Sequence, residues 1–478
     1  MTKKKGRRQR CPFLLEAGAA LDPLHWPAMD PVAAAERPVA PSMPMRADAH
    51  RIVIVGGGAG GLELATKLGN SLGRKRRATV VLVDATPTHL WKPLLHEVAA
   101  GTLNSYQDEL NYIAHARAHH FRYRFGRMDG LDRARKEIRL APIADPAGNE
   151  IVPAMRIAYD TLVIAVGSVS NDFDTPGARE HCAFLDTRAE AESLHRALLV
   201  GVLAGVADVP ADGGMDVAIV GGGATGVELA AELRRMGEEL SRYGVPIRPD
   251  ALRVTLIEAA PRILSTLPEG LAGSVRTALE GLGIRVLTGA PVARIEATGV
   301  TLADGTSIPA RVKVWAAGIK APDFLKDLDG LESNRNGQLA VRRTLQTTRD
   351  DDVFAFGDCA QCPQPGSDRP VPARAQAAHQ QASFLLGSLT RRLEGKPLAD
   401  FAYRDFGSLV SLSRYTAVGS LMGGIFRHSH RIEGRLARLA YIALYRMHQM
   451  ALHGVWRTAI LILTSRLQRV TQPSLKMH

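Results

Sequence analysis

Two glycine-rich loops constrain the fold of this chain more than any other feature of its sequence. Each loop follows a short β-branched run, at 51–55 and at 217–220, and precedes a helical pattern. The glycines fit the spacing G-x-G-x-x-G and are Gly56, Gly58 and Gly61 in the first loop and Gly221, Gly223 and Gly226 in the second. In such loops the first glycine permits a tight turn, the second lets a pyrophosphate approach the backbone, and the third lets the helix pack close to the strand. Two complete loops in one chain predict two dinucleotide sites.

An acidic residue follows each loop at the end of a second strand. Asp84 ends "ATVVLVD" and lies 28 residues after Gly56, farther than the usual spacing of about 20, because the polar insert "NSLGRKRR" lengthens the connection. We expect Asp84 to accept hydrogen bonds from ribose hydroxyls. Glu258 ends "LRVTLIE", and a carboxylate there favours the free ribose hydroxyls of NADH over the 2′-phosphate of NADPH. Arg262 is near enough in sequence to weaken that preference.

Two dinucleotide sites imply one fixed and one exchanging nucleotide. The chain order predicts FAD at the first loop and NADH at the second. A later strand, "VFAFGD", ends in Gly357 and Asp358, whose carboxylate could reach the ribityl or pyrophosphate region of FAD. The alternative for Asp358 is a helix N-cap, and both roles could hold at once.

The length of 478 residues is too great for one ordinary core. Apolar strands that end in small residues recur at 161–168, 312–318 and 353–358. We therefore predict an α/β chain with two Rossmann-like domains, the first interrupted by the second. The predicted parts are a leader at 1–49, the FAD domain at 50–170 and 326–400, the NADH domain at 171–325, and C-terminal strands and amphipathic helices at 401–478.

The C-terminal segment is basic and amphipathic. Between 431 and 478 the sequence has seven Arg and one Lys against one Glu, and the whole chain has a net charge of +12. No zinc-finger spacing and no alternation of aromatic and basic residues supports nucleic-acid binding, so an anionic membrane surface is the favoured partner. The helical apolar pattern comprises Leu436, Leu439, Ala440, Ala443, Leu444 and Met447, and Trp456 with "AILIL" at 459–463 adds an apolar anchor. No run of 18 apolar residues predicts a spanning helix. The alternatives are a helix packed on the body of the protein or a dimer seam.

Several stretches closely resemble bacterial type II NADH:quinone oxidoreductases, the non-pumping respiratory NADH dehydrogenases of the two-dinucleotide flavoprotein superfamily. They are "HLWKPLLHEVAAG" (89–101), "GGGATGVELAAEL" (221–233), "VWAAGIKAPDFL" (314–325), "FGDCAQCPQP" (356–365), "RAQAAHQQ" (374–381), "GSLVSLS" (407–413) and "ALYRMHQMALHG" (443–454). The resemblance implies FAD bound by Gly56, Gly58, Gly61, Asp84, Gly357 and Asp358, and NADH bound by Gly221, Gly223, Gly226 and Glu258. It places Glu228 near the nicotinamide, and Gln376 and Gln380 beside the isoalloxazine and the quinone headgroup.

Spacing alone would favour a plainer interpretation of these residues. Gln376 and Gln380 are four apart on one helix face, and two exposed glutamines on an ordinary helix would be the commoner case. His89, His96 and His379 have no metal-ligand spacing with a third partner, so structural histidines are expected and no metal site is predicted. Only the resemblance assigns catalytic roles to Glu228 and the glutamines.

The resemblance implies hydride transfer from NADH to FAD and then transfer of two electrons to a membrane quinone. It implies a peripheral enzyme on the cytoplasmic face of the plasma membrane, with NADH, a quinone and an anionic lipid surface as partners. A homodimer is left open.

Two alternatives are weighed against this function. The first is a soluble flavoprotein disulfide reductase that uses Cys359 and Cys362. Such enzymes carry the dithiol just after the first glycine loop, but no cysteine lies between Cys11 and Cys182, so structural thiols are the favoured interpretation. The second alternative is a non-catalytic NADH-sensing flavoprotein, which the presence of Glu228 and both glutamines disfavours.

Overall fold

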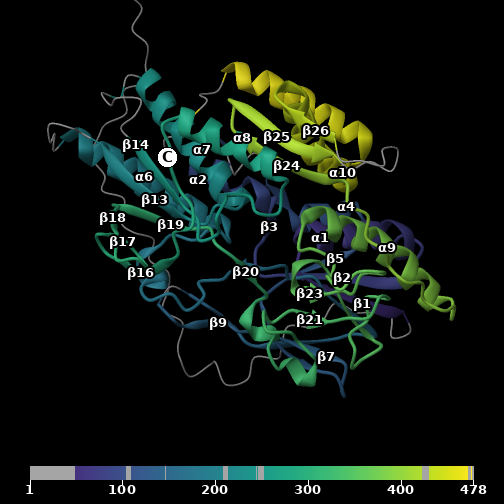
Figure 1. Cartoon of the computed structure of the whole chain (residues 1–478). Helices are drawn as coiled ribbons and strands as arrows, with labels where there is room; N and C mark the ends of the chain where they lie inside the picture. Colours follow the sequence, from purple (N-terminus) through teal and green to yellow (C-terminus); the bar gives the residue numbers. More distant parts are fainter. Residues whose placement is uncertain are drawn as a thin grey trace, which may run out of the picture. The chain divides into compact units, whose positions relative to one another are not determined.

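The first sheet of the computed structural model is parallel and combines strands from both predicted segments of the FAD domain, 50–170 and 326–400 (Figure 1). Its strands, in order across the sheet, are β22 (Val353–Ala355), β11 (Thr161–Ile164), β1 (His50–Val55), β2 (Ala78–Asp84) and β5 (Arg122–Phe125). Strands β11 and β22 are buried along their whole length, as expected for a parallel sheet covered on both faces. The structure describes residues 49–103, 109–145, 147–207, 214–243, 245, 252–421, 430–471 and 475. Apart from Ala49, the predicted leader lies outside these ranges.

Two helices far apart in sequence, α1 (Ala59–Leu68) and α9 (Ala375–Leu393), pack against each other beside this sheet (Figure 1). A Cβ on Gly60 would stand 2.5 Å from the Phe356 ring and 3.2 Å from Ala378, so the glycine permits the close contact. Helix α1 begins at Ala59, within the glycine loop itself. The π-helical turn η2 (Gly69–Gly73) extends this helix and contains part of the polar insert that lengthens the connection to Asp84.

A second parallel sheet carries the second glycine loop. Its strands, in order, are β15 (Arg285–Leu287), β14 (Leu252–Ile257), β13 (Met215–Val220) and β19 (Val312–Trp315). Helix α7 (Ala224–Arg242) follows the loop, and α2 (Leu95–Ala99) contacts both α7 and α6 (Arg188–Ala207). Two parallel sheets confirm the predicted α/β architecture.

The connections that lead into and out of the predicted NADH domain lie side by side. Strand β12 (Val169–Ser170) pairs antiparallel with β20 (Ile319–Lys320). The chain therefore leaves the first sheet after β11 and returns to it at β22 through one short two-stranded connection.

The last part of the chain forms an antiparallel sheet and a long helix (Figure 1). The strand-like stretch 407–421 is a hairpin of β24 (Gly407–Leu412) and β25 (Thr416–Leu421), to which β26 (His430–Glu433) is added. Helix α10 (Arg435–Thr471) contacts all three strands and is interrupted at Gly454, where φ is 76°. Among the described residues no helix is long and apolar enough to cross a membrane.

The remaining elements are short. The strands are β3 (Thr88–His89), β4 (Leu110–Asn111), β6 (Met128–Asp132), β7 (Glu137–Leu140), β8 (Ile143–Ala144), β9 (Glu150–Val152), β10 (Met155–Ala158), β16 (Val292–Glu296), β17 (Gly299–Leu302), β18 (Ser307–Pro309), β21 (Leu339–Ala340) and β23 (Ala360–Gln361). The helices are α4 (Tyr112–Ala118), α5 (Ala178–His181), α8 (Glu269–Gly281) and the 3₁₀ turns η3 (Lys92–Leu94), η4 (Asp323–Leu325), η5 (Leu328–Gly330) and η6 (Gly357–Cys359).

Candidate active site

The first glycine loop has the backbone geometry of a pyrophosphate cradle. Gly56 has φ of 102°, and a Cβ there would stand 2.4 Å from the Ala165 carbonyl oxygen. A Cβ on Gly61 would stand 1.9 Å from the Gly56 carbonyl oxygen, so both positions accept only glycine. Gly58 differs, because no atom lies within 4 Å of its Cβ position and it borders the central cavity. Gly58 is also the N-cap of α1 without a side-chain cap, which leaves the helix N-terminus available to an anion.

Asp84 shapes this loop directly. Its Oδ2 accepts a 2.6 Å hydrogen bond from Gly57 N, and its Oδ1 accepts one of 2.8 Å from Thr86 N. The Tyr112 hydroxyl donates to the Gly57 carbonyl at 2.7 Å. Asp84 therefore fixes the turn that would receive a dinucleotide, and ribose binding by the same carboxylate remains a prediction.

The second loop repeats this arrangement. Gly221 has φ of 114°, a Cβ on Gly226 would stand 2.0 Å from the Gly221 carbonyl oxygen, and no atom lies within 4 Å of the Gly223 Cβ position. Glu258 corresponds to Asp84, since its Oε2 accepts from Gly222 N at 2.6 Å. Both loops fit a dinucleotide by the same geometric criteria.

Arg262 does not act as a free cation beside Glu258. Its guanidinium donates hydrogen bonds to three backbone carbonyls, those of Leu264, Ser265 and Leu267. These bonds commit the side chain to its own turn. Arg262 therefore gives little reason to doubt a preference for NADH over NADPH.

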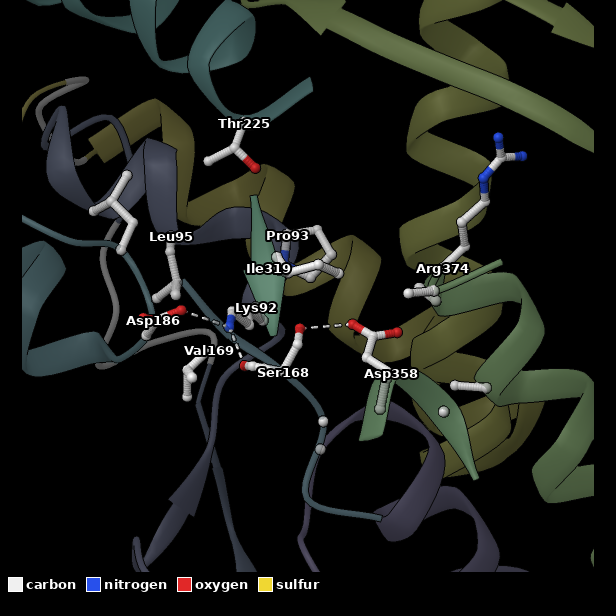
Figure 2. Close-up of a pocket in the computed structure, with 18 of the residues that line it drawn as sticks. Lys92, Pro93, Leu95, Ser168, Val169, Asp186, Thr225, Ile319, Asp358 and Arg374 are labelled. Atoms are coloured by element: carbon white, nitrogen blue, oxygen red, sulfur yellow. Dashed lines mark hydrogen bonds and ion pairs between the residues drawn. The ribbon is translucent and has the colours of Figure 1, made fainter. Parts of the chain in front are cut away.

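Asp358 joins a polar network at the crossing between the two sheets (Figure 2). Its Oδ2 accepts a 2.9 Å hydrogen bond from the Ser168 hydroxyl. Lys92 donates to the Ser168 carbonyl at 2.8 Å and to Asp186 Oδ1 at 3.0 Å. Lys92, Ser168 and Asp186 were not predicted as site residues, although Lys92 lies within the stretch 89–101 that resembles the family. Burial raises the pKa of Asp358, and the bond from Ser168 opposes that shift.

The alternative role of Asp358 as a helix N-cap is wrong. Asp358 lies inside the short turn η6, whose N-cap is Phe356, and the next long helix, α9, has Arg374 as its N-cap. Its carboxylate instead borders the cavity next to Gly357.

Gln376 and Gln380 hold the chain that leads into β24. The Gln376 amide donates to Asp405 Oδ1 at 3.2 Å and to the Gly407 carbonyl at 2.9 Å, which uses both of its N–H groups. The Gln380 amide exchanges two hydrogen bonds with the backbone of Arg404, at 2.8 and 3.0 Å, and keeps one N–H. Both side chains are half-buried and border the cavity, so they are not the two exposed glutamines of the plainer interpretation.

Glu228, on helix α7 after the second glycine loop, reaches β24. Its buried carboxylate accepts a 3.0 Å hydrogen bond from Ser411 N in β24 and lies 3.8 Å from His96 Nδ1. Burial raises the pKa of Glu228 to about 8, with Glu97 and Glu232 adding to the shift, and burial lowers the pKa of His96 to about 4. At neutral pH both groups are mostly uncharged, so their contact is not an ion pair. The three predicted catalytic side chains, Glu228, Gln376 and Gln380, thus all hydrogen-bond to β24 or to the segment just before it.

The protonation of Glu228 gives a prediction for nucleotide binding. Because the folded pKa is raised, the carboxyl is neutral below about pH 8 and becomes an anion as the pH rises through that value. We expect the KM for NADH to rise roughly tenfold between about pH 7 and pH 9, since about 1.4 kcal/mol of like-charge repulsion changes affinity by that factor. In Glu228→Gln the KM should stay flat over that interval, as measured by steady-state oxidation of NADH. An equally steep rise in the variant would assign the ionisation to another group.

Cys359 and Cys362 do not form a redox centre in the described structure. Both thiols are buried and free, and burial raises their pKa values to about 11 and about 12. The Cys359 thiol donates to the Phe356 carbonyl at 3.2 Å. Since the thiolate is the reactive form, burial favours structural thiols here, the interpretation that the cysteine positions also favoured.

One connected cavity of about 3200 Å³ joins these features. It is bordered by both glycine loops, Asp358, Glu228 and the two glutamines. Helix α10 closes part of it with Ala440, Ala443, Leu444 and Met447, four of the six residues in the predicted apolar pattern. Of the other two, Leu439 is exposed and the side chain of Leu436 lies outside the described residues. The cavity thus extends from the two glycine loops to apolar side chains of α10.

Comparison with known proteins adds independent findings. Residues 50–382 match the family model described as pyridine nucleotide-disulphide oxidoreductase. The chain is 44% identical over 442 residues to the type II NADH:quinone oxidoreductase of Haemophilus influenzae, a match that covers 89% of this chain and 99% of that protein. It is 28% identical over 386 residues to the Staphylococcus aureus protein of the same name, covering 79% of this chain and 91% of that protein. The structure of NDH2 from Plasmodium falciparum in complex with NADH has a similar fold, with a TM-score of 0.74 and 17% identity, over 89% of this chain and 100% of that one.

Proposed function

The chain belongs to the pyridine nucleotide-disulphide oxidoreductase family and to its type II NADH:quinone oxidoreductases, and from this membership we propose how its residues perform that activity. It is an FAD-dependent enzyme that oxidises NADH and reduces a quinone. The observation that carries the proposed mechanism is the single cavity that both glycine loops and α10 border. The disulfide-reductase alternative is not favoured, because both candidate thiols are buried and protonated.

The two loops divide the nucleotides between them. The first, with Asp84 and Asp358, would hold FAD, and the second, with Glu258, would hold NADH. When bound, FAD would supply the redox chemistry between NADH and the quinone. The residues of the chain contribute position and charge. Gln380 keeps one amide N–H that can be donated to a quinone oxygen, whereas both N–H groups of Gln376 already hold the segment before β24.

The exposed face of α10 supports contact with a membrane. Large apolar side chains are exposed along its second half, and they are Val455, Trp456, Ile460, Leu461, Leu463 and Leu467. Trp456, which is 84% exposed, is the kind of side chain that sits at the boundary between lipid and water. A helix of this type lies in the interface plane, and the Arg excess of the segment suits anionic headgroups. We propose a peripheral position on the cytoplasmic leaflet, where a lipid-soluble quinone can enter beside α10.

A charge on the α10 face should weaken this contact. Ile460 is 61% exposed, and we expect Ile460→Glu to reduce binding to vesicles that contain phosphatidylglycerol by about tenfold, since burying one such side chain is worth about 1.5 kcal/mol or more. Vesicle flotation measures the effect. The matched control is Ile151→Glu, at a 65% exposed isoleucine in β9, which should float like the wild type. A loss of dimer mass in Ile460→Glu without any change in flotation would instead identify a dimer seam.

The activity itself is tested by steady-state NADH oxidation with phospholipid present. A ubiquinone analogue and a disulfide substrate are compared as acceptors. We expect turnover with the quinone and none with the disulfide. Absence of turnover with every quinone tried would refute the function, and preferential turnover of the disulfide would restore the reductase alternative.

A further inference from the structure

Quinone reduction requires a proton that NADH does not carry. NADH gives up one hydride, which contains two electrons and one proton, whereas a quinone becomes a quinol by taking two electrons and two protons. One proton per turnover must therefore come from solvent through the protein. A group that can hold it has to border the cavity and reach the surface.

We propose that His379, held by Glu63, donates this proton to the quinone. This inference rests on the proposed function. His379 lies on α9 between Gln376 and Gln380 and borders the cavity, as does Glu63 on α1. Its Nδ1 makes a hydrogen bond to Glu63 Oε2. No other hydrogen bond to His379 is present among the described residues, so Nε2 is the ring atom left for a ligand.

Glu63 is suited to orient the imidazole of His379. It is buried, yet ionised: burial acts to raise the pKa of its carboxyl, but the bonds from His379 and Lys67 together keep that pKa below its ordinary value. A carboxylate accepts the Nδ1–H of its histidine partner, so it fixes the ring orientation and leaves Nε2 for a ligand. A structural histidine was predicted at this position, because sequence spacing gives no sign of the pairing with Glu63.

The pair is in contact with solvent. The His379 side chain is 26% exposed, and Lys67 Nζ, 2.7 Å from the hydroxyl of the exposed Ser383, holds the other oxygen of the Glu63 carboxylate at 2.5 Å. When the Nε2–H bond of His379 breaks and an O–H bond of the quinol forms, the Nδ1–H bond to Glu63 is kept, and water that enters the cavity returns a proton to Nε2. The step needs no reactant beyond NADH, the quinone and water.

The neighbouring histidines cannot replace His379. The charged and titratable groups around it are Glu63 and Lys67 from α1, His89 from β3, and His448 from α10. Burial lowers the pKa of His89 to about 4 and that of His448 to about 2, so both are neutral at physiological pH. Because both rings are uncharged, neither carries the acidic proton that the step needs.

His448 also indicates that this corner receives a polar ligand. Its ring lies 5.2 Å from the His379 ring, centroid to centroid, and it borders the cavity. It is 3% exposed, its Nε2 lies 3.1 Å from His89 Nε2, and its Nδ1 has no hydrogen-bond partner in the described part of the chain. A buried nitrogen without a partner is costly, and a quinol hydroxyl or quinone oxygen at this point would satisfy it.

The test compares two acceptors in the holoenzyme. Hexacyanoferrate takes electrons without a proton, so His379→Ala should lower the ratio of ubiquinone-analogue to hexacyanoferrate turnover about 100-fold, the lower part of the range for a positioned general acid. Added imidazole should restore part of the quinone activity, increasingly as the pH falls. His120→Asn is the matched control, because His120 is exposed and its φ of 58° suits asparagine.

A readout without turnover tests the role of Glu63. In Glu63→Gln, nitrogen NMR of the ring should show that the Nδ1–H of His379 has lost its hydrogen bond to a carboxylate, while the exposed Glu280→Gln control should leave that signal unchanged. If His379→Ala fails to retain flavin, His379→Gln takes its place, since its amide can keep the bond to Glu63 but cannot donate an acidic proton. An acceptor ratio equal to that of the control, or a fall that imidazole does not rescue, would overturn the inference. A wild type that reduces no quinone would overturn the proposed function instead.

Discussion

Replacing Gly61 by valine is expected to give a protein that contains no flavin. The new Cβ would stand 1.9 Å from the Gly56 carbonyl oxygen and 3.3 Å from Ala165 Cβ. The first of these is a backbone atom, so the clash is relieved only if α1 withdraws from the sheet or the loop opens. Either movement destroys the cradle, and we expect FAD affinity to fall by at least about 100-fold, or about 2.8 kcal/mol. Flavin absorbance after gel filtration measures the loss.

A second substitution separates loss of FAD from loss of fold. Gly58→Ala places its methyl group where no protein atom lies within 4 Å, so folding should be preserved. The methyl group would still occupy the space through which a pyrophosphate approaches the backbone. We expect a wild-type circular dichroism spectrum with weaker flavin binding. Full flavin content in both variants would show that the first loop is not the FAD site.

Replacing Gly226 by valine is expected to abolish reduction by NADH while FAD stays bound. Its Cβ would stand 2.0 Å from the Gly221 carbonyl oxygen and 3.4 Å from Ile219, both in the second sheet and its loop. The first cradle is not touched by this change. NADH should therefore fail to bleach the flavin in a stopped-flow experiment, with a rate at least about 1000-fold lower, whereas dithionite should still reduce it.

The milder partner of this variant is Gly223→Ala, which has open space around its Cβ position. It should raise the KM for NADH with little effect on flavin content. If Gly226→Val lost its flavin and Gly223→Ala did not change the KM, the assignment of the two nucleotides to the two loops would be reversed or wrong.

The parts of the site that were predicted from sequence are those encoded by neighbouring residues. A strand, three spaced glycines and a helix occupy one short stretch, and the conformation of Gly56 and Gly221 follows from that local pattern. Asp84 and Glu258 follow because each ends the next strand of its sheet, and adjacent parallel strands bring their ends together. The family resemblance added Glu228 and the glutamines, which spacing alone would have left as surface residues.

The parts that were missed depend on contacts between distant segments. Lys92, Ser168 and Asp358 meet only because the first sheet is completed by β22, which comes from the last third of the chain. Glu63 and His379 are 316 residues apart and face each other because α1 and α9 pack side by side. Neither helix carries a sequence signal for its partner.

The sequence by itself determined the two nucleotide cradles, because a glycine turn and the acid that follows it are local consequences of residue type and strand period. The tertiary structure decided everything that joins the cradles to an acceptor. It brought Gln376 and Glu228 into hydrogen bonds with β24 and Gln380 into hydrogen bonds with Arg404 before it, buried both cysteines, and aligned His379 with a carboxylate from α1. Those outcomes depend on which helix faces cover which sheet, and that choice is made by packing of the whole core, which no single stretch of sequence encodes.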